Sequence, residues 1–167
     1  MSTATILLAE DDANDVILFQ RAMERASLDT NSLRVVPDGE EAIAYLGGQG
    51  IYSNRDLYPL PDLVLLDLKM PRKSGLEVLS WMRKQPQLRY LIVVFLTSSN
   101  NTPDVRGAYD LGANSYLVKP VEFNQMVEMI RCLSFYWLEM NEKLPVSDAL
   151  ASGENGRKSN GSCGDAL

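Results

Sequence analysis

The chain has 167 residues, of which 46% are hydrophobic and 23% are charged, a balance typical of one globular domain. Its net charge of −6 argues against nonspecific nucleic-acid binding, which requires clustered lysines and arginines. The absence of histidine excludes a Ser-His-Asp triad, a histidine-bound zinc and a phosphohistidine relay within this chain. The two cysteines give neither a disulfide framework nor a metal spacing, so we expect a reducing, cytoplasmic environment.

No segment approaches the roughly 20 apolar residues that a membrane-spanning helix requires. The opening sequence MSTATILLAEDD lacks the basic start and the long apolar region of a signal peptide. We therefore expect no contact with membranes.

Short apolar runs alternate with segments of helical periodicity in the first part of the chain. TILLA at 5–9 predicts a buried strand, and apolar residues at helical spacing predict a helix over 14–26. LRVV at 33–36 predicts the second strand. Asp38 followed by Glu41 has the spacing of a capping box and predicts the start of the second helix.

The same alternation continues after a loop at 47–62 that is rich in Gly, Tyr and Pro. LVLLDL at 63–68 predicts the third strand. Ser74 and Glu77 form a second capping-box pattern, which opens a helix that Pro86 closes.

The last third of the chain supplies two more strands and two more helices. LIVVFLTS at 91–98 predicts the fourth strand, and SYLVK at 115–119 predicts the fifth. Thr102 followed by Pro103 predicts an N-cap with proline at the first helical position. A long final helix is predicted over 122–143.

Five strands that alternate with five helices indicate an α/β fold. Continuous apolar strands belong in a parallel sheet covered on both faces, and right-handed crossovers make that fold doubly wound. Residues 145–167 lack periodicity and are rich in Gly, Ser, Asn and Asp. We expect a domain over 1–144 followed by a disordered polar tail.

Polar residues stand where these apolar strands end. The first strand leads into Glu10, Asp11 and Asp12, the third into Asp67, the fourth into Thr97 and the fifth into Lys119. In a parallel sheet these ends meet at one edge, which is where ligands bind in such folds. Each residue alone has a structural explanation, as a helix N-terminus, a turn or a surface strand end, but their joint placement predicts a site.

Carboxylates that lie close together repel one another, and a hard divalent cation relieves the repulsion. Asp67, Asp11 and a backbone carbonyl just past Asp67 could therefore hold Mg²⁺. Lys119 and Thr97 offer an ammonium and a hydroxyl suited to phosphoryl oxygens. This arrangement favours attack by a carboxylate on phosphorus. Asp12 is interpreted as a helix-capping or outer acid.

The motifs LLAEDD, LLDLKMP, FLTSS and YLVKP occur in this order in the receiver domains of two-component response regulators, which the chain resembles over about 4–143. The resemblance implies a flavodoxin-like fold with a five-stranded parallel sheet of order 2-1-3-4-5, here with an extended C-terminal helix. It implies that Asp67 is the phosphoacceptor. It also implies that Asp11 binds Mg²⁺ directly, Glu10 through water, and Lys69 by its carbonyl.

The same resemblance implies roles for residues of the last two strands. Thr97 and Lys119 would bind the phosphoryl group, and Tyr116 occupies the position of the switch aromatic, expected to turn inward on phosphorylation. Lys119–Pro120 matches a peptide bond that is usually cis in this family. Lys69 stands where relatives often have a neutral or amide residue, so we expect it to influence the lifetime of the phosphoryl group.

The function implied is a phosphorylation switch that a histidine kinase charges in the presence of Mg²⁺. Phosphotransfer and autodephosphorylation would be its only chemistry. No DNA-binding domain is expected after residue 143, so a stand-alone receiver would act through protein contacts. The loop at 47–62 and the ending FYWLEMNEKLP resemble regulators that partner phytochrome-type kinases, a group whose members often dimerise, so the resemblance implies a homodimer through the C-terminal helix region. The apolar residues around the final helix are either further cover folded back on this domain or a partner surface.

Two other functions fit parts of the pattern. The chain could be a constitutive dimeric docking module with vestigial phosphorylation, against which the intact set of strand-end residues argues. It could also be a small phosphatase of the haloacid dehalogenase type. Such a phosphatase needs an aspartate two residues after the nucleophile, where this chain has Lys69.

Overall fold

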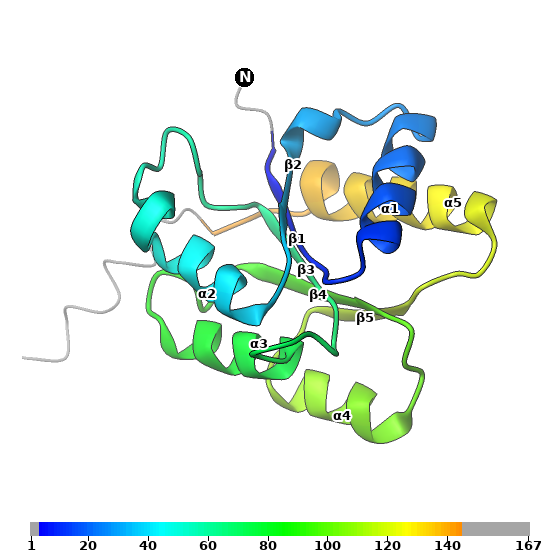
Figure 1. Ribbon diagram of the computed structural model, residues 1–167. Helices are drawn as coiled ribbons and strands as arrows, with labels where there is room; N and C mark the ends of the chain where they lie inside the picture. Colours follow the sequence, from blue (N-terminus) through cyan, green and yellow to red (C-terminus); the bar gives the residue numbers. More distant parts are fainter. Residues whose placement is uncertain (1–3, 145–167) are drawn as a thin grey trace, which may run out of the picture.

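The computed structural model describes residues 4–144, and their five strands form one parallel sheet of order β2-β1-β3-β4-β5 (Figure 1). The predicted fold class and strand order are therefore confirmed. The strands are β1 (Ile6–Ala9), β2 (Leu33–Val36), β3 (Leu63–Leu66), β4 (Ile92–Thr97) and β5 (Ser115–Val118). The α-helices are α1 (Ala13–Arg25), α2 (Gly39–Gly47), α3 (Gly75–Lys84), α4 (Thr102–Asp110) and α5 (Phe123–Ser134).

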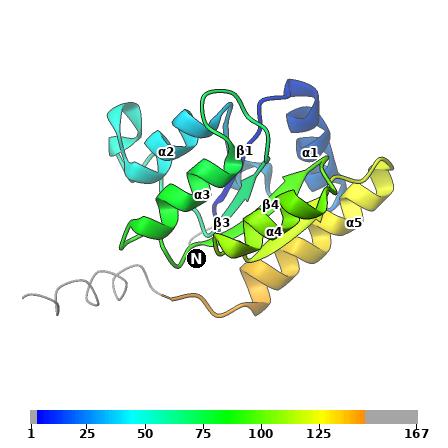
Figure 2. The ribbon, with the colours of Figure 1, turned by 90° about the horizontal axis from the view of Figure 1, so that it is seen from below.

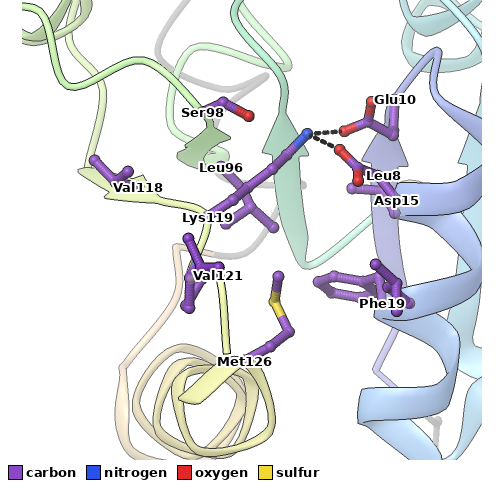
Figure 3. Close-up of a pocket in the computed structure, with 12 residues that line it drawn as sticks. Leu8, Glu10, Asp15, Phe19, Leu96, Ser98, Val118, Lys119, Val121 and Met126 are labelled. Carbon is purple, nitrogen blue, oxygen red and sulfur yellow. Dashed lines mark hydrogen bonds and ion pairs between the residues drawn. The ribbon is translucent and has the colours of Figure 1, made fainter. Parts of the chain in front are cut away.

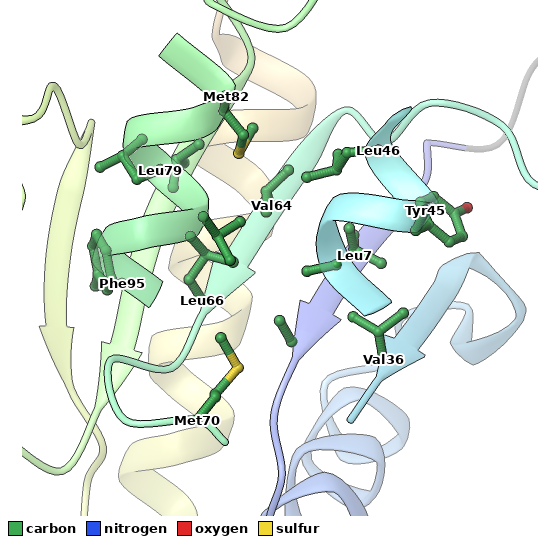
Figure 4. Close-up of a cluster of buried hydrophobic side chains, with 14 of the residues drawn as sticks. Leu7, Val36, Tyr45, Leu46, Val64, Leu66, Met70, Leu79, Met82 and Phe95 are labelled. Atoms are coloured by element: carbon green, nitrogen blue, oxygen red, sulfur yellow. The ribbon is translucent and has the colours of Figure 1, made fainter. Parts of the chain in front are cut away.

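Helices cover both faces of the sheet, with α1 and α5 on one face and α2, α3 and α4 on the other (Figures 1 and 2). Along β1, Leu7 belongs to the core beneath α2 and α3, while Ile6 and Leu8 belong to the core beneath α1 and α5. Figure 4 shows the first of these cores, where Leu46 and Met82 of the helices meet side chains of the central strands. Burial on both faces explains why the strands are continuously apolar.

The two capping boxes that the sequence predicts, at α2 and α3, differ in the structure. At α3, Ser74 accepts from the backbone N–H of Glu77, and the Glu77 carboxylate accepts from the N–H of Ser74, so the predicted capping box is confirmed. At α2, Asp38 accepts from the N–H of Glu41 at 2.9 Å, but the Glu41 carboxylate instead accepts from the Tyr52 hydroxyl at 2.6 Å. The capping box predicted at Asp38 and Glu41 is therefore one-sided.

The fourth helix starts one residue earlier than the sequence predicts. Asn101 occupies the N-cap position of α4, and Thr102 is its first helical residue. The prediction that Thr102 caps this helix is wrong, because proline fits the first turn at either of its first two positions.

The final helix changes its geometry where its fully buried residues end. The α-helical part stops at Ser134 and continues as a π-helical segment, η3 (Phe135–Met140). Val127, Ile130 and Leu133 are buried against the sheet and α1, whereas Phe135 and Tyr136 are about half exposed. The sequence predicts one helix over 122–143. The structure instead has a buried α-helix followed by an aromatic, partly exposed π-helical extension.

The long loop after α2 is tied to that helix. It contains one short 3-10 helix, η2 (Gly50–Ser53); another, η1 (Thr30–Ser32), lies just before β2. The Arg55 guanidinium donates to the carbonyls of Tyr45 at 2.8 Å and Leu46 at 2.7 Å. A cation on the last carbonyls of a helix satisfies groups that the helix leaves unpaired.

No helix within residues 4–144 is long and apolar enough to cross a membrane. The predicted tail, 145–167, lies outside the described residues.

Asp38 links α2 to the turn after β3 and gives stability a pH dependence. Its carboxylate is buried and accepts from Arg72 as well as from α2. Burial raises the pKa of Asp38, but the hydrogen bonds from Arg72 and the α2 backbone outweigh this and hold the pKa below its usual range. This pairing therefore stabilises the fold fully at pH values above the unfolded-state pKa of aspartate, about 3.9. The stabilisation is lost as pH falls through the lower pKa of the folded state.

We expect Asp38→Asn to lower the Tm at pH 7 by roughly 2–5 °C, because asparagine can still cap the helix but cannot pair with Arg72. The difference from the wild type should shrink in thermal scans below about pH 4. Glu40→Gln, which removes only an exposed charge 3.9 Å from Arg72, is the control. A difference that persists unchanged to the lowest accessible pH would contradict the assignment.

Candidate functional site

The acidic residues of the site extend directly from the paired central strands. Ala9 of β1 lies opposite Leu66 of β3, and the residues that follow them are Glu10 and Asp67. The Asp67 N–H still donates to the Ala9 carbonyl at 3.0 Å, and the Glu10 N–H donates to the Val36 carbonyl at 3.0 Å. The last backbone bonds of the sheet therefore fix both acids at its carboxyl edge.

Three carboxylates meet at this edge. Glu10, Asp11 and Asp67 each offer an oxygen atom, and these atoms lie within 4.8 Å of one another. Glu10 and Asp67 are buried, whereas Asp11 is exposed. Burial, assisted by the charge of Asp67, raises the pKa of Glu10 despite the hydrogen bond from Lys119. A set of oxygen donors whose charges repel fits a hard divalent cation.

Lys119 supplies the positive charge within this cluster. Its Nζ atom donates to Glu10 Oε2 at 2.6 Å and to Asp15 Oδ2 at 2.7 Å (Figure 3). The same atom lies 3.7 Å from Asp67 Oδ2. Burial lowers the pKa of Lys119, but the hydrogen bonds to Asp15 and Glu10 and the charge of Asp67 outweigh burial and raise it. Lys119 is therefore a permanent cation at neutral pH.

Thr97 and Tyr116 both contact the loop between β4 and α4. Thr97 is buried at the end of β4, and its hydroxyl oxygen accepts from the Ser99 N–H at 3.4 Å. The Tyr116 ring stacks on Phe95 with 5.8 Å between centroids, and its hydroxyl donates to the Ser99 carbonyl at 2.9 Å. Residue 99 thus connects the end of β4 with the aromatic ring on β5.

Most residues that the sequence singles out lie at this edge. Glu10, Asp11, Asp67 and Lys119 are brought together, Thr97 ends the adjacent strand, and Asp12 caps α1 by accepting from the Asn14 N–H at 2.8 Å. Lys69 lies exposed in the turn after β3. That its backbone carbonyl binds the metal stays a prediction.

Two features differ from the sequence-based reading. Asp15 is bonded to Lys119 but was not among the predicted residues, although its place one helical turn after Asp11 puts it near the start of α1. The expected cis bond at Lys119–Pro120 is wrong, since residues 4–144 contain no cis peptide bond. The trans form is the intrinsically preferred one even before proline.

A cavity of about 340 Å³ lies beside Lys119, between α1 and the start of α5 (Figure 3). Phe19, Met126 and Val121 contribute to its apolar wall, and Glu10, Asp15 and Lys119 line its polar end. The charged edge of the sheet is therefore continuous with an apolar hollow.

Gly75 allows α3 to begin directly against the phosphoacceptor candidate. A Cβ atom at this position would lie 2.3 Å from the Asp67 carbonyl oxygen and 2.8 Å from the Phe95 ring. The Gly75 N–H also donates to the Leu68 carbonyl at 3.0 Å. Only glycine permits this approach, so α3 holds the backbone of Asp67 in place.

The parallel sheet of order 2-1-3-4-5 and the acidic carboxyl edge define a flavodoxin-like α/β protein with a candidate site for a divalent cation. Residues 6–131 match the family model described as the response regulator receiver domain. The chain belongs to this family, as its motifs indicate.

Similar proteins extend over most of the chain. Response regulator Rcp1 of Synechocystis sp. is 39% identical over 134 residues, which cover 80% of this chain and 88% of Rcp1. The phosphorylated cyanobacterial phytochrome response regulator RcpA has a TM-score of 0.77 and 34% identity, covering 86% of this chain and 100% of that one. The Mn²⁺-bound form of Rcp1 has a TM-score of 0.75 and 37% identity, covering 85% of this chain and 99% of that one.

We expect Gly75→Ala to destabilise the protein by about 1–3 kcal/mol, because the added methyl group must displace the Asp67 backbone. Gly107→Ala in α4 is the matched control. Its Cβ would find its nearest neighbour at 3.7 Å, and it should instead stabilise the helix by about 0.5–1 kcal/mol. Urea unfolding of both variants measures the two effects, and equal midpoints for both would refute the role given to Gly75.

Proposed function

We propose that this chain is a stand-alone response regulator in which Asp67 accepts a phosphoryl group from a histidine kinase. The observation that carries the proposal is the meeting of the three carboxylates with the Lys119 ammonium at the carboxyl edge of the sheet. Membership of the receiver family supports the same reading. Phosphotransfer and autodephosphorylation would be the only reactions.

The Asp67 carboxylate is held in a defined orientation for this reaction. Its Oδ1 atom accepts from the Leu68 N–H at 2.7 Å, and its Oδ2 atom faces Lys119. In the transfer, a carboxylate oxygen forms a bond to phosphorus while the bond from phosphorus to the kinase imidazole breaks, and that imidazole keeps the electron pair. Lys119 would neutralise charge on the phosphoryl oxygens, and the Thr97 hydroxyl would donate to one of them.

The metal proposed for this site is Mg²⁺. Glu10, Asp11, Asp67 and the Lys69 carbonyl would hold it, and the oxygen donors and their crowding fit such a cation. When bound, it would neutralise negative charge shared by the acids and the phosphoryl group. The Mn²⁺-bound form of the similar Rcp1 supports a divalent cation in general. The lifetime of the phosphoryl group is proposed to depend on Lys69.

The switch is proposed to run through Thr97 and Tyr116. A phosphoryl group that draws the Thr97 hydroxyl would take it from the Ser99 N–H, and the Tyr116 hydroxyl bonds the carbonyl of the same Ser99. Movement of this loop would change the surface formed by α4, β5 and α5.

The proposed partners are a kinase and a second copy of the chain. Names of similar proteins, among them the phytochrome response regulator RcpA, favour a phytochrome-type kinase. A cytoplasmic location is part of the same proposal. Phe135, Tyr136 and Met140 are 52%, 53% and 62% exposed on η3. Such an exposed apolar group at the end of the helix favours a homodimer formed through this region.

We expect the wild type to incorporate phosphate from a small phosphodonor such as acetyl phosphate when Mg²⁺ is present, and Asp67→Asn to incorporate none. Chelation of the metal should abolish labelling of the wild type. Asp12→Asn, which keeps the α1 cap, should label normally. Undiminished labelling of Asp67→Asn would refute the assignment of the phosphoacceptor.

We expect Phe135→Ser with Tyr136→Ser to convert a dimer into a monomer, because the exposed apolar group would be removed. Sedimentation with and without beryllofluoride measures the mass of wild type and variant. An unchanged mass in the double variant would reject this interface. An identical wild-type mass and kinase affinity in both conditions would favour the alternative of a constitutive docking module.

A further inference from the structure

Lys119 is shared among three carboxylates, and the sharing is unequal. Its Nζ atom makes hydrogen bonds of 2.6 Å to Glu10 and 2.7 Å to Asp15, while Asp67 lies 3.7 Å away, beyond hydrogen-bond distance. The ammonium is therefore directed toward β1 and α1, away from the proposed phosphoacceptor.

The two acids that hold Lys119 differ in how firmly they are fixed. The Glu10 side chain is 3% exposed, and its second oxygen accepts from the Asp12 N–H at 3.0 Å. The Asp15 side chain is 35% exposed and projects from the first turn of α1 (Figure 3). Of the two bonds, the one to Asp15 is the easier to break, since water can replace Lys119 there.

We infer that Asp15 is a positioning residue that holds Lys119 toward α1 and thereby sets how readily Lys119 turns to a phosphoryl group on Asp67. This inference rests on the proposed function of Asp67. The bonds to Glu10 and Asp15 hold Nζ 3.7 Å from Asp67 Oδ2, so Lys119 must turn from this position to donate to a phosphoryl group on Asp67. A phosphoryl group therefore competes with Asp15 for Lys119, and Asp15 favours the unmodified state.

The test measures the affinity of the full chain for beryllofluoride, which imitates a phosphoryl group on aspartate, by ¹⁹F NMR at saturating Mg²⁺. Asp15→Asn removes the competing charge and should tighten binding by about two- to fivefold, the range expected for a partly exposed ion pair. Asp12→Asn is the matched control, because it removes the same charge from the same end of α1 without touching Lys119. Asp15→Glu restores the carboxylate and should return the affinity toward that of the wild type.

Equal affinities for Asp15→Asn and Asp12→Asn would overturn the inference, since a general change in charge would then explain both. Weaker binding by Asp15→Asn would overturn it too, because Asp15 would then prepare Lys119 for the phosphoryl group. The ¹⁵N resonance of Lys119 Nζ gives a second readout, and it should shift on adding beryllofluoride less in Asp15→Asn than in the wild type. A wild type that binds no beryllofluoride would refute the proposed function itself.

Discussion

The site depends on the pairing of β1 with β3, which places two buried carboxylates side by side at the end of the sheet. Glu10 and Asp67 follow residues in register, so their separation is set by the spacing of neighbouring strands and not by flexible loops. Two buried carboxylates at the spacing of neighbouring strands repel each other, and the Lys119 ammonium offsets this repulsion. The balance between these charges is what a cation or a phosphoryl group would change.

The apolar core is the support for this balance. Residues before Glu10 and Asp67 are buried on both faces of the sheet, so the backbone that carries the acids cannot shift without disturbing two cores. Gly75 adds a third support, because α3 begins in contact with the Asp67 carbonyl. Rigid mounting of this kind lets small changes in charge be expressed as changes in the less firmly held parts, among them the loop after β4.

The sequence was sufficient for the parts of the site that follow from strand ends. Glu10, Asp67 and Lys119 each stand directly after an apolar run, and parallel topology brings such positions together. Asp15 could not be found in this way, since its role depends on the direction in which α1 leaves β1. The π-helical turn of η3 was missed for a related reason: apolar residues continue through Phe135 and Tyr136, and their spacing alone does not show where sheet contact ends.

One strand joins the chemistry to the surface. Lys119 follows the last residue of β5, and its N–H donates to the Thr97 carbonyl at 2.8 Å, so the ends of β4 and β5 are linked by backbone as well as by side chains. Tyr116 stands three residues earlier on the same strand and holds Ser99 from the other side of the loop. A shift of Lys119 toward Asp67 would therefore act on a short strand end whose neighbours are already bonded to the β4–α4 loop. The contact between Lys119 and Asp15 lies at the opposite end of this chain of bonds, so the positioning role proposed for Asp15 would extend from α1 to the surface formed by α4 and β5.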